Sequence, residues 1–320
     1  MDAGERRGSP GRAGLDLAPL SRVLVVNAGS TSLKLSLVDA DEASEPVNDF
    51  VPADAVGHRI VHLGGLAVDA ALVDDTLIDS IEEGVEVAPL HNLPALSALR
   101  RAQTALPDVP HVAVSDSDFH RTMTPEAREY AIPRDWRDSF GIVRHGFHGL
   151  AVAWVAEQVR ARRLVVCHLG GGCSVTAVAD GRSLDTSMGL TPLEGPPMGT
   201  RSGSIDPGAL LYLLRHDVEV GELDRVLNEE SGLAALGGLD EPFAQSHFTY
   251  HLAKAVAGMA AALGGLDAIA FSGGIGENRP EVRDAITSRL GFLGSFDVHV
   301  VPVREDVVVA RAVRRLLAVT

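Results

Sequence analysis

The stretch that decides the fold covers residues 164–206 and reads LVVCHLGGGCSVTAVADGRSLDTSMGLTPLEGPPMGTRSGSID. It starts with a short apolar run that leads into three consecutive glycines, Gly170, Gly171 and Gly172. The alternation over residues 174–178 then favours a returning strand. Glycine lets the backbone approach a ligand closely, and successive N–H groups in such a turn form an anion-binding concavity. The stretch therefore predicts a β-hairpin whose turn cradles a phosphate.

The same pattern occurs twice, because residues 22–39 (RVLVVNAGSTSLKLSLVD) are similar to residues 163–180 (RLVVCHLGGGCSVTAVAD). Internal self-similarity of this kind implies two related halves. A third glycine turn, residues 271–278 (FSGGIGEN), stands between an apolar run and the helical pattern of residues 280–290. A strand, a glycine loop and a helix in this order commonly bind nucleotides. We therefore expect an α/β fold of two lobes, each with a mixed sheet, and a site in the cleft between them.

Composition bounds the class of protein. The 320 residues, 46% of them hydrophobic, are enough for about two domains. A net charge of −15 argues against nucleic acid or an anionic membrane as partner. Arginine supplies nearly all the positive charge, since the only lysines are Lys34 and Lys254; we attribute the arginine excess to compositional drift but note that Lys34 falls in the first hairpin.

The two cysteines, Cys167 and Cys173, are too few for a metal cluster, and we do not expect a disulfide between them. The sequence shows no signal peptide and no spanning segment, which predicts a cytoplasmic protein. Residues 1–21 are rich in Gly, Arg and Pro and are interpreted as a disordered leader.

The remaining pattern predicts further elements. Strands are expected at residues 57–65, 81–89 and 110–115 and from residue 298, and helices at 150–160, 250–263 and 305–319. Residues 88–103 should begin as a loop containing His91 and Asn92, ahead of Pro94, and continue as an amphipathic helix. Asp116 follows a predicted buried strand, where it could face a ligand or cap the next turn.

The order of these motifs resembles one family. VLVVNAGSTSLKLSL, GHRIVH, APLHN, DSDFHRTM, GFHG, CHLGGGCSVTAV, DTSMGLTPLEGPPMGTRSGSIDPG, FSGGIGENRPEVR and VPVRED occur in the order found in the acetate kinases and related short-chain carboxylate kinases. The resemblance extends from Val23 to the end of the chain. It implies a duplicated two-lobe fold of the actin-like, ribonuclease-H-like and sugar-kinase-like type, with an interlobe cleft. It also implies reversible phosphoryl transfer from ATP to acetate, giving acetyl phosphate and ADP.

The resemblance also implies the division of the chain. The N-terminal lobe would be residues 22–118, shortened relative to the family and completed by the C-terminal helix 306–320. Residues 119–305 would form the nucleotide-binding lobe. A homodimer would be the assembly.

The resemblance assigns roles to individual residues. Arg59 and Arg201 would hold the carboxylate and the transferred phosphoryl group, since guanidinium binds planar oxyanions through paired hydrogen bonds. His148 would donate to the transition state with help from His91. Asn27, Asp116 and Glu305 would hold or orient Mg²⁺, with Mn²⁺ as a possible substitute.

Two larger sets complete the implied site. An apolar wall would receive the methyl group of the substrate, and it consists of Val61, Leu90, Phe147 and Pro192. The nucleotide and its phosphates would be bound by Ser30, Ser32, Lys34, His168, Gly170, Gly171, Gly172, Gly273, Gly274, Ile275, Gly276 and Asn278. One extra methylene changes the binding free energy of the substrate by only about 1 to 3 kcal/mol, so propionate is an alternative substrate.

The sequence departs from the family in four places. Lys34 and Arg59 stand closer together than usual, Gly171 replaces the polar residue of the glycine turn, and Leu150 and Ala151 replace Thr and Ser. The adenine-binding segment between residues 231 and 248 is also short. These departures leave open another donor such as pyrophosphate, or another short acid. They also leave open a non-catalytic nucleotide-binding relative and, as a weaker possibility, an actin-like filament former.

Overall fold

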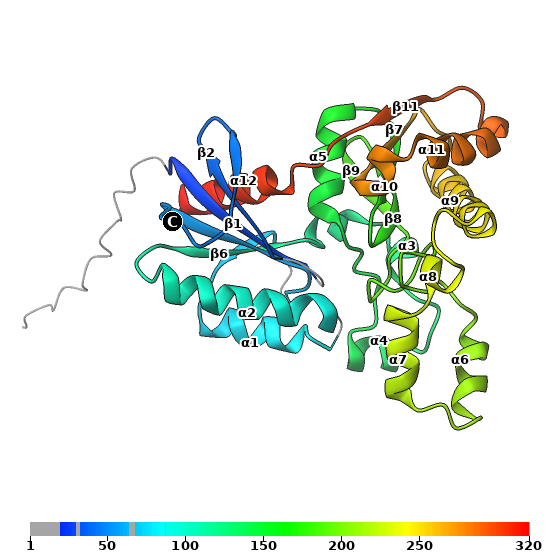
Figure 1. Ribbon diagram of the computed structural model, residues 1–320, viewed down its shortest axis with the longest axis horizontal. Helices are drawn as coiled ribbons and strands as arrows, with labels where there is room; N and C mark the ends of the chain where they lie inside the picture. The colour runs from blue at the N-terminus through cyan, green and yellow to red at the C-terminus, as the bar shows by residue number, and fades with distance from the viewer. Residues whose placement is uncertain (1–19, 30–32, 64–67, 87, 320) are drawn as a thin grey trace, which may run out of the picture.

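The computed structural model describes residues 20–29, 33–63, 68–86 and 88–319, and these form two α/β lobes (Figure 1). The leader prediction therefore falls almost entirely outside the described residues. Each lobe is built on one mixed sheet, as predicted.

The N-terminal sheet has the strand order β3-β2-β1-β4-β6-β5. Its strands are β1 (Arg22–Ala28), β2 (Leu33–Asp39), β3 (Ser44–Val47), β4 (Ala55–Ile60), β5 (Ala70–Leu72) and β6 (His111–Ser115). Strands β1, β4 and β6 run parallel, whereas β2 and β5 are antiparallel to their neighbours. The carboxyl ends of β1, β4 and β6 therefore meet at one edge, where Asn27, Arg59 and Asp116 lie.

Helices cover both faces of this sheet. On one face lie α1 (Asp75–Glu83) and α2 (Pro89–Ala105), whose Leu77, Ile81 and Leu99 pack against strand residues. On the other lies α12 (Glu305–Leu317), which returns from the far end of the chain (Figure 1).

The C-terminal sheet has the order β11-β10-β7-β8-β9. Its strands are β7 (Arg163–Leu169), β8 (Cys173–Ala179), β9 (Arg182–Thr186), β10 (Ala268–Ser272) and β11 (Asp297–Val300). Helix α5 (Gly149–Val159) covers one face, while α9 (Pro242–Ala262) and α11 (Pro280–Thr287) cover the other. Helix α5 also joins the lobes, because Glu157 forms an ion pair with Arg311 of α12.

The shorter elements lie around this sheet. They are the 3₁₀ helices η1 (Asp118–Thr122) and η2 (Ser288–Leu293), and the helices α3 (Pro125–Arg128), α4 (Arg134–Phe140), α6 (Pro207–Leu214), α7 (Val220–Glu229), α8 (Gly232–Ala235) and α10 (Gly273–Asn278). Helices α6 and α7 form a pair that projects from the lower part of the lobe (Figure 1).

The repeated hairpins are confirmed. Strand β1 pairs with β2, and β7 pairs with β8, each over seven residue pairs in antiparallel register. The glycine turn of the second hairpin spans residues 170–172, between Leu169 and Cys173. The two cysteines on this hairpin are free and buried, as expected.

Four expectations were wrong. Of the strand expected at 81–89, residues 81–83 belong to helix α1 and residues 84–86 to the turn after it, because Asp74 caps α1 by accepting a hydrogen bond from the backbone of Leu77, and the apolar residues follow a helical period. His91 and Asn92 lie in the first turns of α2, not in a loop, since the helix starts at Pro89 and accommodates Pro94. Residues 273–278 form the short helix α10 in place of a glycine loop, and helix α9 starts at Pro242, ahead of the predicted residue 250.

Candidate functional site

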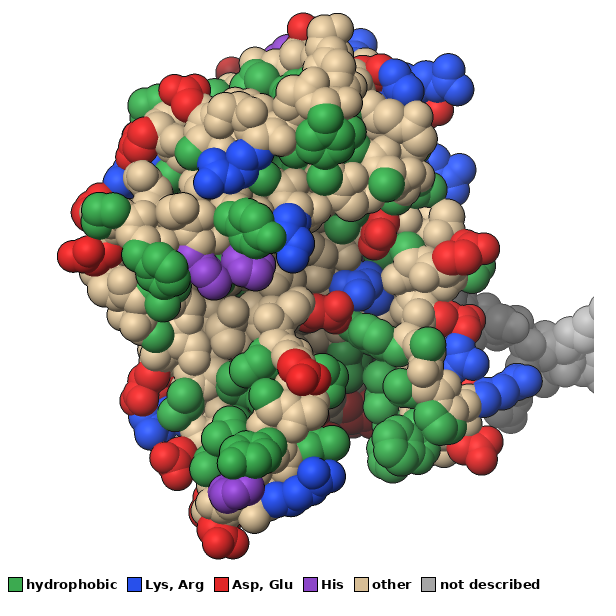
Figure 2. Space-filling model, turned by 90° about the vertical axis from the view of Figure 1, so that its right-hand side faces the viewer, with side chains coloured by type: hydrophobic (Ala, Val, Ile, Leu, Met, Phe, Trp, Pro, Cys, Tyr) green, Lys and Arg blue, Asp and Glu red, His purple; other side chains and the backbone are tan. Residues whose placement is uncertain are grey.

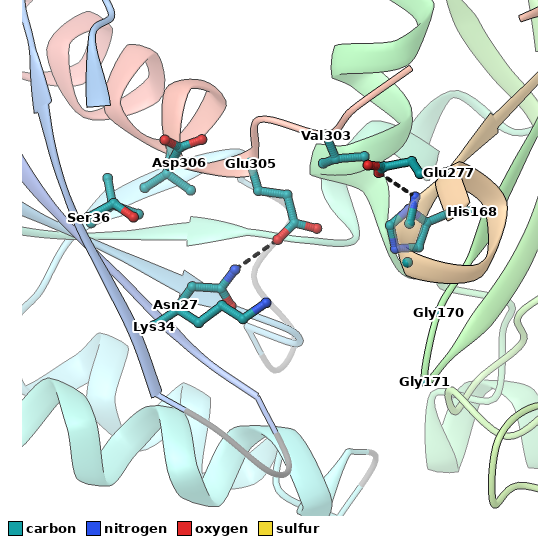
Figure 3. Close-up of a pocket in the computed structure, with 14 residues that line it drawn as sticks. Asn27, Lys34, Ser36, His168, Gly170, Gly171, Glu277, Val303, Glu305 and Asp306 are labelled. Carbon is teal, nitrogen blue, oxygen red and sulfur yellow. Dashed lines mark hydrogen bonds between the residues drawn. The ribbon is translucent and has the colours of Figure 1, made fainter. Parts of the chain in front are cut away.

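A cavity of about 460 Å³ opens between the two lobes. Residues of the N-terminal sheet and of the C-terminal lobe face each other across it (Figure 3). Its lining consists of Val25, Asn27, Lys34, Ser36, His168, Gly170, Gly171, Gly273, Gly274, Glu277, Val303, Glu305, Asp306 and Val309. The repeated hairpins thus contribute to the same cavity from opposite sides, as the sequence predicted.

Arg59 extends from the end of β4 and is only 9% exposed. Its Nη2 donates to Oδ2 of Asp116 at 2.7 Å, and its Nη1 donates to Oδ1 of Asn27 at 3.3 Å. Burial acts to lower the pKa of Arg59, but the carboxylates of Asp116 and Glu305 outweigh it and raise that pKa. The guanidinium is therefore permanently charged and held in one orientation.

Asp116 is fully buried and lies at the junction of three elements. Besides accepting from Arg59, its carboxylate accepts from the backbone N–H groups of His148 at 3.1 Å and Leu150 at 3.3 Å. Its backbone oxygen accepts from Gly149, where an added Cβ would lie 2.4 Å from that oxygen. Asp116 is thus the ion-pair partner of Arg59 at the end of β6, and it also caps α5. A role at the strand end and a capping role were the two predicted alternatives, and Asp116 combines them. Its oxygens are committed inside the protein, so it orients Arg59 and does not face the cavity as a metal ligand.

His148 sits at the N-terminus of α5 in the left-handed region, with φ of 61°. This unusual backbone conformation is common at functional sites. The ring nitrogen Nδ1 lies 3.1 Å from the hydroxyl of Ser174 on β8. Burial, followed by the neighbouring His168 and the charges of Arg59 and Arg201, holds the pKa of His148 well below its usual range. His148 is therefore a neutral imidazole, and both arginines are close enough to act on it.

Arg201 is 7% exposed and differs from Arg59 in its partners. Its Nη1 lies 3.4 Å from the carbonyl oxygen of Pro192 and 3.9 Å from the sulfur of Met198, and its Nη2 donates to Nε2 of His91 at 3.3 Å. None of the ion pairs recorded for the described residues includes Arg201, and burial lowers its pKa. A buried guanidinium without a carboxylate is costly unless an anion binds to it.

The contact with Arg201 determines which nitrogen of the His91 ring carries the proton. Burial and the charges of Arg201 and Arg59 lower the pKa of His91 to about 3, so the ring is neutral. Since Nε2 accepts from Arg201, the ring proton must be on Nδ1. Within the described part of the chain, this buried Nδ1 has no hydrogen-bond partner. It is a second donor available to a bound anion.

Gly172 marks the point where these groups converge. A Cβ at this position would lie 3.2 Å from Nε2 of His148 and 3.3 Å from Nη1 of Arg201. By contrast, a Cβ on Gly171 would meet nothing within 4 Å, because Gly171 faces the open cavity. The apolar wall lies nearby: Val61 of the N-terminal lobe packs in one cluster with Phe147 of the other lobe.

Asn27 near the end of β1 contacts Glu305, the first residue of α12. The Asn27 Nδ2 donates to Glu305 Oε2 at 2.8 Å (Figure 3). Glu305 Oε2 also lies 4.0 Å from Nε of Arg59. A carboxylate and an amide oxygen beside a cavity fit Mg²⁺, which uses few protein oxygens and retains several waters. No group of three or more His, Cys, Asp or Glu side chains within the described ranges could hold a metal alone. The donor set therefore fits an ion that also takes ligands from a bound phosphate.

Not every predicted residue reaches the cavity. Lys34, His168, Gly170, Gly171, Gly273 and Gly274 line it, with His168 Nδ1 3.1 Å from the Ser272 hydroxyl. Ile275 and Gly276 instead pack inward, toward Phe271 and Cys167, and Asn278 bonds to the backbone of Gly274 at the surface. These three residues do not line this cavity, and their assignment to the nucleotide stays a prediction. Ser30 and Ser32 lie outside the described residues, as does the side chain of Leu90.

Comparison with known proteins supplies the family. The model of the acetokinase family matches residues 48–310. The chain belongs to this family. The acetate kinase of Deinococcus deserti is 43% identical over 317 residues, which cover 91% of this chain and 79% of that protein. Acetate kinase 1 of Neisseria meningitidis serogroup A is 43% identical over 265 residues, covering 75% and 67%.

Solved structures agree with this acetokinase in fold. A propionate kinase from Francisella tularensis superposes with a TM-score of 0.83 at 31% identity, covering 91% of this chain and 98% of the other. An acetate kinase from Porphyromonas gingivalis gives 0.79 at 26% identity, covering 93% and 100%. The predicted two-lobe actin-like fold is confirmed. None of the described helices combines the length and the hydropathy that crossing a bilayer requires.

Sequence reasoning missed several supporting residues of this acetokinase. Glu277 lines the cavity and accepts a hydrogen bond from the backbone of Gly273 at 2.9 Å (Figure 3). Asn92 is fully buried and clamps the backbone of His62, accepting from its N–H at 3.2 Å and donating to its carbonyl at 2.8 Å. It thereby ties the segment after β4 to the helix that carries His91. Glu277 and Asn92 both stood inside quoted motifs, but only helical geometry could show which way they point.

Proposed function

We propose that this acetokinase catalyses reversible phosphoryl transfer between ATP and acetate, giving acetyl phosphate and ADP. One observation carries the proposal: Arg201 is buried without a carboxylate and converges with His91 and His148 beside the cavity. Arg59, already paired with Asp116, acts on the same two imidazoles from the other lobe. A site that brings two anions together needs such a concentration of positive charge and N–H donors.

The protein residues divide the work in this mechanism. A carboxylate oxygen of acetate attacks the terminal phosphorus of ATP, the bond to ADP breaks, and no protein nucleophile is required. Arg201 and Arg59 hold the acetate and the phosphoryl group in line. The Nδ1–H of His91 and the ring of His148 donate to phosphoryl oxygens. Val61, Phe147 and Pro192 enclose the methyl group and exclude water.

The nucleotide is held from the cavity side. The backbone N–H groups of Gly171 and Gly274, together with Lys34 and His168, bind its phosphates, while Gly170 and Gly273 shape the lining, since their N–H groups donate to Gly172 and Glu277. Mg²⁺, or Mn²⁺, would be held by Asn27 and Glu305, and when bound it neutralises phosphate charge. Asp116 keeps Arg59 in place.

Another phosphoryl donor, or another carboxylic acid as acceptor, is a specific alternative. The space around Gly171 leaves room where the family has a polar side chain, so pyrophosphate is a candidate donor. Propionate is a candidate acceptor, because one extra methylene discriminates weakly. A protein that only binds nucleotide would have no use for Arg201 and His91 in this arrangement.

The test is a hydroxamate assay, which traps acyl phosphates. Acetate and propionate are supplied in turn with ATP, GTP or pyrophosphate and Mg²⁺. We expect hydroxamate with ATP and acetate and none without Mg²⁺. Formation with pyrophosphate but with neither nucleotide would replace ATP as donor, and no product with any pair would refute kinase activity.

We also propose that the protein is a cytoplasmic homodimer. Support comes from exposed apolar side chains on the projecting helices and on α9, including Leu211 (52% exposed), Tyr212 (59%) and Phe243 (67%). Figure 2 shows hydrophobic side chains gathered on the projecting part at the bottom of this face. Tyr212→Glu together with Leu211→Glu should shift the sedimentation coefficient from dimer to monomer. An unmodified protein that sediments as a monomer would disprove the dimer.

A further inference from the structure

Lysine is rare in this chain, and the two lysines lie in different settings. Of 28 basic residues, 26 are arginines, and only Lys34 and Lys254 carry side-chain amines. A guanidinium stays protonated, so it does not react with acylating agents as an amine does. Side-chain acylation of this protein is therefore limited to two positions.

Lys34 points into the interlobe cavity. It lies on β2 opposite Asn27 of β1, its side chain is exposed, and it lines the cavity across from Gly170 and Gly171 (Figure 3). No ion pair or hydrogen bond recorded for the described residues includes its side chain. Among the described lining residues it is the only lysine or arginine, and it faces the carboxylates of Glu277, Glu305 and Asp306.

Lys254 is a natural internal comparison. It lies on the exposed side of α9, and its Nζ is 5.3 Å from the centroid of the Tyr250 ring. A cation–π contact of this kind favours the charged ammonium, which is not nucleophilic. Lys254 is not among the residues that line the interlobe cavity.

We propose that Lys34 is a site of acylation by the acyl phosphate that this enzyme makes, an inference that rests on the proposed function. The uncharged amine attacks the carbonyl carbon of the acyl phosphate, and a C–N bond forms. The C–O bond to phosphorus breaks, inorganic phosphate leaves with the electron pair, and the nitrogen loses a proton to water. The product is an amide, and no oxidant or further reactant is needed.

Proximity makes Lys34 the favoured position. Lys34 attracts the phosphate of an acyl phosphate into the cavity, and because the carbonyl carbon is only two bonds from phosphorus, it then meets the Lys34 amine at high effective concentration. The modification removes the positive charge of Lys34 and leaves three carboxylates in the cavity. Phosphate binding then weakens, so accumulation of the product slows the enzyme that made it.

The test uses the whole chain and added acetyl phosphate, without nucleotide or Mg²⁺, followed by peptide mass spectrometry. We expect acetylation at Lys34 to be faster than at Lys254 by about an order of magnitude. ADP should protect Lys34 and leave Lys254 unaffected, and unfolding in urea should make the two rates similar. The modified enzyme should show a higher KM for ATP.

Two variants complete the test. Lys34→Arg should remove the preferred label, whereas Lys254→Arg should keep both the label at Lys34 and the activity. Equal or faster labelling at Lys254 in the folded protein, or no protection by ADP, would overturn the proposal. Because acetyl phosphate is added as a reagent, a protein inactive in the hydroxamate assay would refute the kinase activity independently of the labelling result.

Discussion

At the scale of single residues, the buried Arg201 contrasts with the partly buried Arg144. Arg144 in the C-terminal lobe is paired with Glu194 at 2.7 Å and donates to four backbone carbonyls. Arg201 has a carbonyl, a thioether and an imidazole as neighbours, and its recorded contacts include no carboxylate. Leaving a charge in this state lowers the stability of the free protein, and a bound anion restores it.

This contrast predicts opposite effects on stability. Arg201→Met should raise the free energy of unfolding of the ligand-free protein by about 1 to 3 kcal/mol, because it removes an uncompensated buried charge. Arg144→Met, the control, should lower it by about 1 to 2 kcal/mol, because Glu194 keeps only the Tyr130 hydroxyl and four backbone carbonyls lose a donor. Urea unfolding in a buffer without phosphate or carboxylate measures both. Destabilisation by Arg201→Met to the same extent as Arg144→Met would contradict our view of Arg201.

Two adjacent glycines make a second residue-scale prediction. Gly172→Ala should reduce kcat/KM by about tenfold, since its Cβ would push His148 and Arg201 aside by a few tenths of an ångström, and a misplacement of about 1 Å costs about 100-fold. Gly171→Ala should have little effect, and Gly171→Asn should lower the KM for ATP by supplying a polar group to the cavity. Steady-state kinetics on the three variants decide this; similar losses for both alanine variants would be inconsistent with the geometry.

At the scale of elements, strand β4 links the site to a buried histidine pair. His58, next to Arg59, is 1% exposed, and its Nε2 lies 2.9 Å from Nδ1 of His111 on β6. His111 Nε2 lies 3.0 Å from the carbonyl oxygen of Leu106, so it must donate there, and His58 Nε2 must donate to His111. Burial, and then His111, lowers the pKa of His58 to about 3.

The pair predicts acid sensitivity with a definite sign. Above about pH 6.5, His58 is neutral in both the folded and the unfolded protein, and its contribution to stability is complete. Below that pH only the unfolded chain takes up the proton, so the free energy of unfolding decreases as the pH falls toward 3. His58→Phe should reduce the slope of unfolding free energy against pH between 4.5 and 6 by about 1.4 kcal/mol per unit, one proton. His216→Gln, in the exposed turn between α6 and α7, should leave the slope unchanged. An unchanged slope in His58→Phe would show that His58 does not titrate this way.

The sequence predicted the repeated hairpins correctly but not helix α1. The repeated hairpins could be recognised because strand alternation and glycine turns are local signals. Helix α1 could not, because its exposed acidic residues obscured the helical spacing of Leu77, Ser80 and Ile81. The strand expected there was wrong for that reason.

The site shows the same limit. Arg59, His91, His148 and Arg201 could be named from motifs. That Arg59 pairs with the carboxylate of Asp116, while Arg201 contacts the neutral ring of His91, could not be predicted. That difference depends on contacts between residues more than 50 positions apart. Glu277 was missed because only the helical conformation of α10 turns its carboxylate back toward Gly273.

At the scale of the whole molecule, the two lobes supply complementary halves of one site. The N-terminal lobe provides Arg59 and His91, the C-terminal lobe provides His148 and Arg201, and α12 returns Glu305 to the boundary. Neither half alone holds the paired guanidinium groups. The elements that carry the site residues of the N-terminal lobe, β1, β4, β6 and α2, are all present.

The most direct test of the central claim is Arg201→Ala, with turnover and nucleotide affinity measured on the same preparation. We expect hydroxamate formation from ATP and acetate to fall by at least about 1,000-fold, because the variant loses a hydrogen-bond donor to the transition state. The Kd for ADP should change by less than about threefold. Turnover close to that of the unmodified protein would show that the second guanidinium does not bring the anions together. A parallel loss of ADP binding would place Arg201 on the nucleotide and not on the acceptor.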